Sequence, residues 1–130
     1  AIGGGFVVML GCDARLGVPS NAKLALSEVA AGILYPACPM EIVKAELAPD
    51  IRRRLVLSGG PISPAEAHTL GIVDELVAAD RLVSRAVDLA RARSALPAYA
   101  RVKEQLKRDT LQRMRAIVAD AKDPMLDHWV

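Results

Sequence analysis

Three consecutive glycines, Gly3 to Gly5, stand directly before a short apolar run at residues 6–10. A glycine cluster ahead of a regular element suits a turn in which the backbone closely approaches another group, because no Cβ obstructs it. By periodicity alone the apolar run fits either a buried helix or a buried strand. We predict a helix here, entered through a tight glycine turn.

Proline and glycine divide the next part of the chain into short elements. Strands are predicted at residues 15–18, 23–26 and 72–77, and helices at residues 39–47, with Pro39 in the first turn, and at Pro49–Ser58. The clearest local signal is Ser63-Pro64-Ala65-Glu66, which predicts a capping box with proline at the first helical position. Gly71 is expected to end that helix.

Two long helices are predicted to close the chain. Asp80 should cap the first of them, Pro97 should break it, and the second should cover residues 98–121. An apolar stripe runs along the second helix through Val102, Leu106, Met114, Ile117 and Ala121. Two such helices after a compact mixed region suggest an appendage that packs on another surface.

The charge pattern argues against a nucleic-acid binder, because the net charge of the 130 residues is only +2. Lys and Arg nevertheless gather at residues 91–115, a segment with eight basic residues and only two acidic ones, Glu104 and Asp109. This excess would either attract the phosphates of a nucleotide-bearing substrate or form the solvated face of a helix. Charge runs more often have the second role.

The two cysteines indicate neither a metal site nor a disulfide framework. Cys12 and Cys38 lack the spacing of metal ligands or redox motifs, and Cys12 is expected to be a small buried residue. No apolar run approaches the roughly 20 residues that span a bilayer, and the first ten residues lack a basic signal-peptide region. We expect a soluble, cytoplasmic protein with no membrane partner.

Four motifs together resemble the enoyl-CoA hydratase/isomerase (crotonase) superfamily. They are AIGGGF at residues 1–6 ahead of Cys12-Asp13, LSEV at residues 26–29 followed by Gly32, RLVLSG at residues 54–59 leading into ISPAEA at residues 62–67, and LGIVDE at residues 70–75. Each motif alone is weakly specific. Their order and spacing carry the resemblance from Ala1 to about Lys107.

The resemblance implies an α/β fold, the C-terminal portion of a crotonase-like spiral of ββα units. Residues 1–92 would form the C-terminal half of the spiral core, and residues 93–130 would form a helical region that assembles a trimer or hexamer. Because Ala1 is not a methionine and family members are longer than this chain, we expect a longer parent polypeptide. Its other half would supply most of the coenzyme A pocket.

The resemblance also implies an acyl-CoA thioester as substrate, with coenzyme A part of the substrate and no separate cofactor or metal. Gly4 would supply one of two backbone N–H donors that stabilise an enolate-like charge at the thioester carbonyl. The second donor would come from the other half of the protein. Gly3, Gly5 and Val7 would border the substrate. Without the family pattern, Gly3 to Gly5 are more simply a tight turn.

Glu28 aligns with the family glutamate that transfers a proton at the acyl chain. Its neighbours Leu26, Val29 and Ala30 form an apolar setting, which would prepare a carboxylate for proton exchange near neutral pH. On the residues alone, a single glutamate after a short strand is more often a surface residue or a cap. The resemblance favours the catalytic role.

Val7 marks a departure from the family pattern. Hydratases of the family generally carry a second glutamate at this position, and residues 1–12 contain no acid. One carboxylate suffices to move a proton between two carbons, so isomerase-like chemistry is the first expectation. The alternatives are an enoyl-CoA hydratase that takes its second polar group from the other half, and a non-catalytic acyl-CoA-binding subunit.

Overall fold

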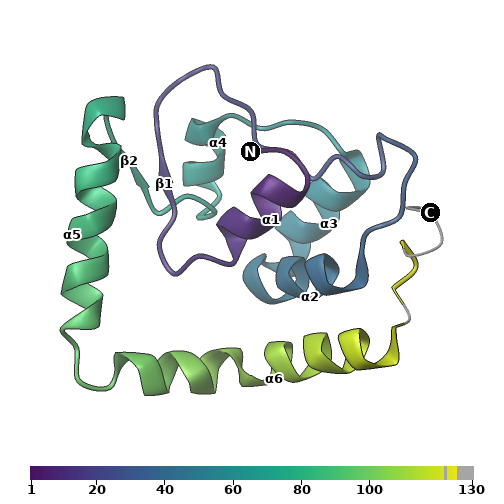
Figure 1. Ribbon diagram of the computed structural model, residues 1–130. Helices are drawn as coiled ribbons and strands as arrows, with labels where there is room; N and C mark the ends of the chain where they lie inside the picture. Colours follow the sequence, from purple (N-terminus) through teal and green to yellow (C-terminus); the bar gives the residue numbers. More distant parts are fainter. Residues whose placement is uncertain (122, 126–130) are drawn as a thin grey trace.

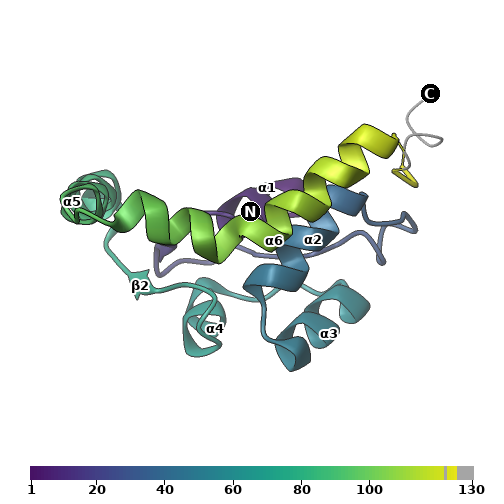
Figure 2. The same ribbon diagram turned by 90° about the horizontal axis from the view of Figure 1, so that it is seen from below.

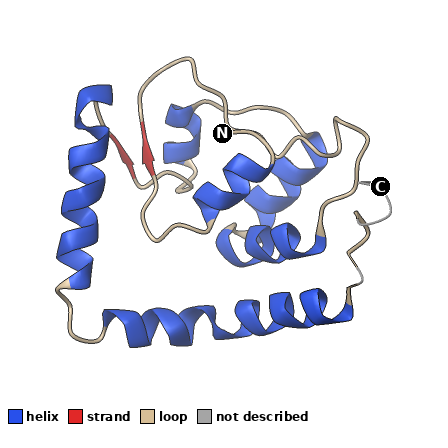
Figure 3. Cartoon of the chain, viewed as in Figure 1, coloured by secondary structure: helices blue, strands red, loops and turns tan. Residues whose placement is uncertain are grey.

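The computed structural model describes residues 1–121 and 123–125, and most of its regular structure is helical (Figure 3). In chain order the elements are α1 (Gly4–Leu10), β1 (Leu16–Gly17), α2 (Ala37–Glu46), α3 (Pro49–Ser58), α4 (Pro64–Thr69), β2 (Glu75–Leu76), the 3₁₀ helix η1 (Ala79–Arg81), α5 (Leu82–Ser94) and α6 (Tyr99–Asp120). Helices α1 to α4 gather together, while α5 and α6 run along two sides of that group (Figure 1).

The hydrophobic core lies between the short helices and the segment that precedes Glu28. Its fully buried side chains are large and apolar and include Phe6, Leu10, Leu26, Val43 and Ile72. Helix α1 contributes because its Phe6, Val7 and Leu10 face inward. The predicted helix at residues 6–10 is therefore confirmed, and it begins two residues earlier, within the glycine cluster.

Local signals located the helix ends well where a cap or a proline marks them. Helix α3 has the predicted bounds and starts at Pro49. The capping box of α4 is present: Ser63 Oγ accepts a hydrogen bond from Glu66 N at 3.2 Å, and Glu66 Oε2 accepts one from Ser63 N at 2.7 Å. Gly71 follows α4 with φ +69°, a left-handed conformation that glycine adopts without strain.

Two of the three predicted strands are present but shorter than predicted, and the third does not form. β1 and β2 pair in parallel over two residues each, with Leu16 opposite Glu75. The strand predicted at residues 23–26 is wrong, because this segment makes only two isolated bridges, Ala25 with Ile2 and Leu24 with Ile62. The bridge to Ile2 cannot extend into a ladder, because the chain turns into α1 directly afterwards. Repeated ββα units are not seen among the described residues.

Helices α5 and α6 have no buried residues, and one expectation about them is wrong. Asp80 does not cap α5: it lies within η1, and Arg81 occupies the N-cap position without a side-chain cap bond. The apolar stripe of α6 is not absorbed by the core, since Val102 and Leu106 are 56% and 76% exposed. The trimer or hexamer through residues 93–130 stays a prediction, and residues 122 and 126–130 of that region lie outside the described residues.

Gly59 ends α3 and supports the turn that carries Glu28. Its φ is +61°, and a Cβ added there would lie 2.9 Å from both Ala30 Cβ and Val29 Cγ1. Gly71 has a similar φ of +69°, but a Cβ added there would meet nothing within 4 Å. The two glycines therefore differ only in whether a side chain has room.

We predict that Gly59→Ala destabilises the protein much more than Gly71→Ala. The left-handed conformation should cost alanine about 1–2 kcal/mol at either position. Overpacking against residues 29 and 30 should add roughly 1–3 kcal/mol at position 59 alone. Chemical denaturation of the two variants measures the difference, and equal losses would show that Gly59 does not hold this turn.

Candidate active site

A single parallel bridge places the start of α1 beside the segment that carries Glu28. Ile2 pairs with Ala25, and Gly3 N donates a hydrogen bond to Ala25 O at 2.8 Å. Gly3 has φ +54°, and a Cβ there would lie 3.4 Å from Glu28 Oε1. A glycine at position 3 thus meets two needs, the left-handed turn and the close approach of a carboxylate.

Glu28 begins a compact turn that ends at Gly32. Ile33 N donates to Glu28 O at 3.1 Å and Gly32 N donates to Val29 O at 3.3 Å, while Gly32 has φ +71°. This hydrogen-bond pattern is a Schellman motif, which normally ends a helix and reverses the chain. The carboxylate is 8% exposed, and its Oε2 is buried without a hydrogen-bond partner among the described residues.

Tyr35 is a residue of this site that the sequence did not reveal. After the reversal at Gly32 its hydroxyl lies next to the Glu28 carboxylate, and burial first, then that carboxylate, raise the pKa of Tyr35 above its usual range. The hydroxyl is buried and short of hydrogen-bond geometry with any described residue. A tyrosine in a loop carries no motif, so only the folded turn identifies it.

Gly4 offers a free backbone donor next to this carboxylate. It is the first residue of α1, and its N–H donates no hydrogen bond within the described part of the chain. Gly4 and Gly5 are exposed, and a Cβ on either would meet nothing within 4 Å. Val7, in contrast, is 3% exposed and packs in the core. The structure therefore brings Gly3 and Glu28 together, places Gly4 directly after Gly3, and turns Val7 inward.

The sequence comparison with protein families covers nearly the whole chain. Residues 1–128 match the family model described as enoyl-CoA hydratase/isomerase. The chain belongs to this family. The resemblance in the four sequence motifs is thereby confirmed, together with a crotonase-like fold.

Named relatives are similar at modest identity. The chain is 28% identical over 130 residues to the (E)-benzylidenesuccinyl-CoA hydratase of Thauera aromatica, covering all of this chain and 46% of that protein. It is 34% identical over 92 residues to the human mitochondrial enoyl-CoA hydratase domain-containing protein 2, covering 71% of this chain and 31% of the other. The chain thus spans less than half the length of either curated relative.

A solved structure with a similar fold is the apo form of an Mtb enoyl-CoA isomerase. The TM-score is 0.81 at 27% sequence identity, and the match covers 89% of this chain and 52% of that one. The family thus includes relatives named both for hydration and for isomerisation.

Three of the eight Lys and Arg side chains at residues 91–115 form ion pairs within the described part of the chain. Three cations of α6 pair with carboxylates from other parts of the chain: Lys103 with Asp13 at 2.5 Å, Lys107 with Glu46, and Arg113 with Glu41 at 2.6 Å. Figure 2 shows α6 crossing over α2, which carries Glu41 and Glu46. Neither role considered from the sequence, phosphate attraction or solvation alone, accounts for these three residues.

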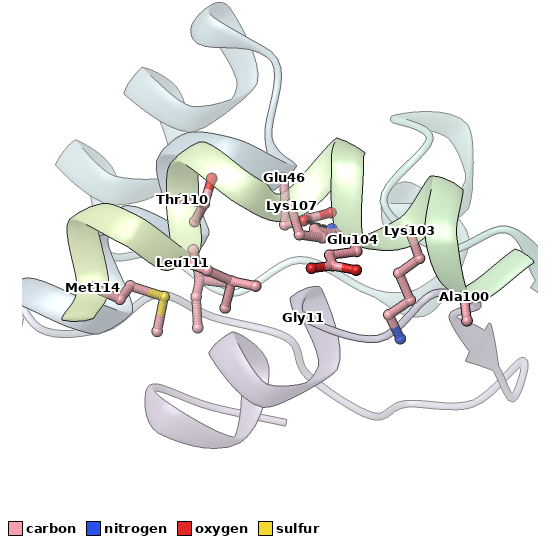
Figure 4. A pocket seen from close by; sticks show the side chains of 10 residues that line it. Gly11, Glu46, Ala100, Lys103, Glu104, Lys107, Thr110, Leu111 and Met114 are labelled. Carbon is pink, nitrogen blue, oxygen red and sulfur yellow. Dashed lines mark hydrogen bonds and ion pairs between the residues drawn. The ribbon is translucent and has the colours of Figure 1, made fainter.

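A hollow of about 430 Å³ lies along α6 (Figure 4). Neither Glu28 nor Gly4 is among the residues that line it. Its wall is mainly apolar and includes Ile42, Leu111 and Met114. Of the charged groups that line it, Lys107 is paired with Glu46 and Lys103 is paired with Asp13.

Other candidate residues have no catalytic setting. Cys12 is exposed, so the expectation that it is buried is wrong; it lies in the turn after α1, outside the core, and its Sγ contacts Val8 O at 3.4 Å. His68 Nδ1 pairs with Val73 O at 3.0 Å at the edge of α4. The described residues contain no cluster of His, Cys, Asp or Glu that could hold a metal ion, and no helix long and apolar enough to cross a membrane.

The paired carboxylate Glu41 predicts a measurable pH dependence. Hydrogen bonds from Lys44 and then Arg113 lower the pKa of Glu41, so the pair contributes stability above the unfolded-state pKa and loses it as pH falls through the lower folded-state value. As the pH is lowered below about 4.5, the unmodified protein should lose about 1 kcal/mol more of its free energy of unfolding than a Glu41→Gln variant, which has no carboxylate to protonate. The effect is this small because both cations are about half exposed. Denaturation at a series of pH values measures this, and parallel curves would contradict it.

Proposed function

We propose that the whole protein converts an acyl-CoA thioester through an enolate that a backbone oxyanion hole stabilises, with Glu28 as a single proton shuttle. The reaction is then the movement of a carbon–carbon double bond along the acyl chain, as in an isomerase. Glu28 removes a proton from one carbon and returns it to another, so its charge is restored in each turnover. Coenzyme A enters only as part of the substrate.

The observation that carries this proposal is the contrast between the two buried acids. Glu28 and Glu41 are each 8% exposed. Glu41 is held by Lys44 at 2.8 Å and by Arg113 at 2.6 Å, whereas none of the ion pairs of the described residues includes Glu28. A buried carboxylate without a cation is costly for stability, and such groups are typical of functional sites.

The free N–H of Gly4 supports the oxyanion part of the proposal. A donor already fixed in place needs no reorganisation when negative charge develops on the thioester oxygen. Gly4 directly follows Gly3, where an added Cβ would lie 3.4 Å from Glu28 Oε1. The donor and the base therefore lie at the same turn.

The apolar character of position 7 favours isomerisation over hydration. Val7 is buried among Phe6 and Leu10, so the position holds no second carboxylate to activate water. A single carboxylate suffices to move a proton between two carbons. Relatives are named for both reactions, so the preference for isomerisation rests on position 7.

Glu28→Gln should separate catalysis from stability. We expect turnover of 3-enoyl-CoA to fall by roughly 100-fold to 10,000-fold, since general base catalysis is removed. Stability should be unchanged or higher, because a buried charge without a partner is lost. The matched control is Glu41→Gln, which should lower stability and leave the rate per folded molecule unchanged.

The measurement combines turnover of 2-enoyl-CoA and 3-enoyl-CoA with deuterium uptake from solvent at the substrate α and γ carbons. Full uptake and turnover in Glu28→Gln would remove Glu28 from the mechanism. Efficient hydration of 2-enoyl-CoA by the unmodified protein would favour a hydratase.

Gly4→Pro tests the oxyanion donor, with Gly4→Ala as its control. Both variants add a Cβ where there is open space, and proline is tolerated at the first position of a helix. Only proline lacks the N–H. We expect Gly4→Pro to lower kcat by about 100-fold to 1,000-fold relative to Gly4→Ala. Steady-state kinetics of the two variants give this ratio, and equal kcat values would show that the Gly4 N–H is not a donor to the transition state.

A further inference from the structure

Two buried polar atoms near the start of α1 have no partner, and they are complementary. Glu28 Oε2 can only accept a hydrogen bond when the carboxylate is charged, and the Tyr35 hydroxyl can donate one. An unpaired buried polar group is unfavourable, and in a native structure it calls for an explanation. The two groups lie next to each other because the Gly32 turn reverses the chain between them.

We infer that Tyr35 is a positioning residue whose hydroxyl donates a hydrogen bond to the Glu28 carboxylate and leaves Oε1 free for proton transfer. The inference rests on the proposed function, because it gives Tyr35 a role only through Glu28. In this structure the pair is adjacent but short of hydrogen-bond geometry. Contacts of this kind commonly shorten when a substrate fills the site.

The electrostatic setting makes Tyr35 a donor and not a base. Burial and the neighbouring carboxylate both raise the pKa of the Tyr35 hydroxyl, so the hydroxyl keeps its proton throughout the physiological pH range. A second hollow, different from the one along α6, is lined by Tyr35, Glu41 and Lys44. Glu41 and Lys44 are already paired with each other at 2.8 Å. Tyr35 is a buried polar group that remains available to Glu28.

The two carboxylate oxygens then have different tasks. Oε1 lies beside Gly3, at the turn that presents the Gly4 N–H, and Oε2 is enclosed. A donor on Oε2 would fix the rotation of the carboxylate about its last side-chain bond. It would also stabilise the charged form that accepts the substrate proton. Small errors in the placement of such a base are costly in rate.

Tyr35→Phe in the whole protein tests this role while keeping the ring that packs against the core. We expect kcat for 3-enoyl-CoA to fall about 10-fold with KM changed less than about 2-fold, since the transition state loses more than the ground state. The acidic limb of the kcat–pH profile should move up by roughly 0.5 to 1 pH unit, because a hydrogen bond to the charged carboxylate is lost. An unchanged kcat and acidic limb would overturn the inference.

The matched control is Tyr99→Phe. The Tyr99 hydroxyl donates to Asp13 Oδ2 at 2.6 Å, so this variant also removes a tyrosine–carboxylate contact, but on the exposed surface. Its kcat and pH profile should equal those of the unmodified protein. A shift as large as that of Tyr35→Phe would overturn the inference, because it would show that the effect is not specific to Glu28.

The double variant distinguishes the inference from the proposed function. If Tyr35 acts through Glu28, adding Tyr35→Phe to Glu28→Gln should not lower the residual deuterium exchange further. A further 10-fold loss would show that Tyr35 acts independently and would overturn the inference. If Glu28→Gln alone abolishes exchange while Tyr35→Phe has no effect, the proposed function stands and only the inference fails. Full exchange in Glu28→Gln would overturn both.

Discussion

The arrangement of the candidate site depends on one short contact, the parallel bridge between Ile2 and Ala25. The Gly3 N–H to Ala25 carbonyl bond joins the entrance of α1 to the segment that leads into the Glu28 turn. Without it, the glycine turn and the carboxylate would belong to unrelated loops. A bridge of one residue is weak by itself, so the burial of Phe6, Leu26 and Leu10 around it must hold the two segments in place.

The Glu28 turn is supported from a second direction by glycine. Gly59 at the end of α3 leaves no room for a side chain against residues 29 and 30, and Gly32 closes the turn in a left-handed conformation. Gly59 is needed both for its left-handed backbone conformation and for the close contact with residues 29 and 30. Gly32 is needed only for its left-handed conformation. Close packing of backbone elements is how a short loop can hold a buried carboxylate that has no ion pair.

Helix α6 illustrates a different solution, in which charge replaces apolar burial. No side chain of α6 is buried, yet the helix lies along α2 and is held there by the pairs of Lys107 with Glu46 and of Arg113 with Glu41. Sequence periodicity correctly located the helix but could not give the partners of its basic residues. Those partners lie more than 60 residues away in the chain.

The sequence alone determined the helices that carry a local signal, such as Pro49–Ser58 and the Ser63 capping box, because caps and prolines act on neighbouring residues. Its motif order also determined the family and hence Glu28 and Gly4 as candidates. Only the tertiary structure decided that residues 23–26 form bridges and not a strand, and that Cys12 is exposed. It alone placed Tyr35 beside Glu28, because the chain reversal at Gly32 and the surrounding core, not any spacing of residue types, create that contact.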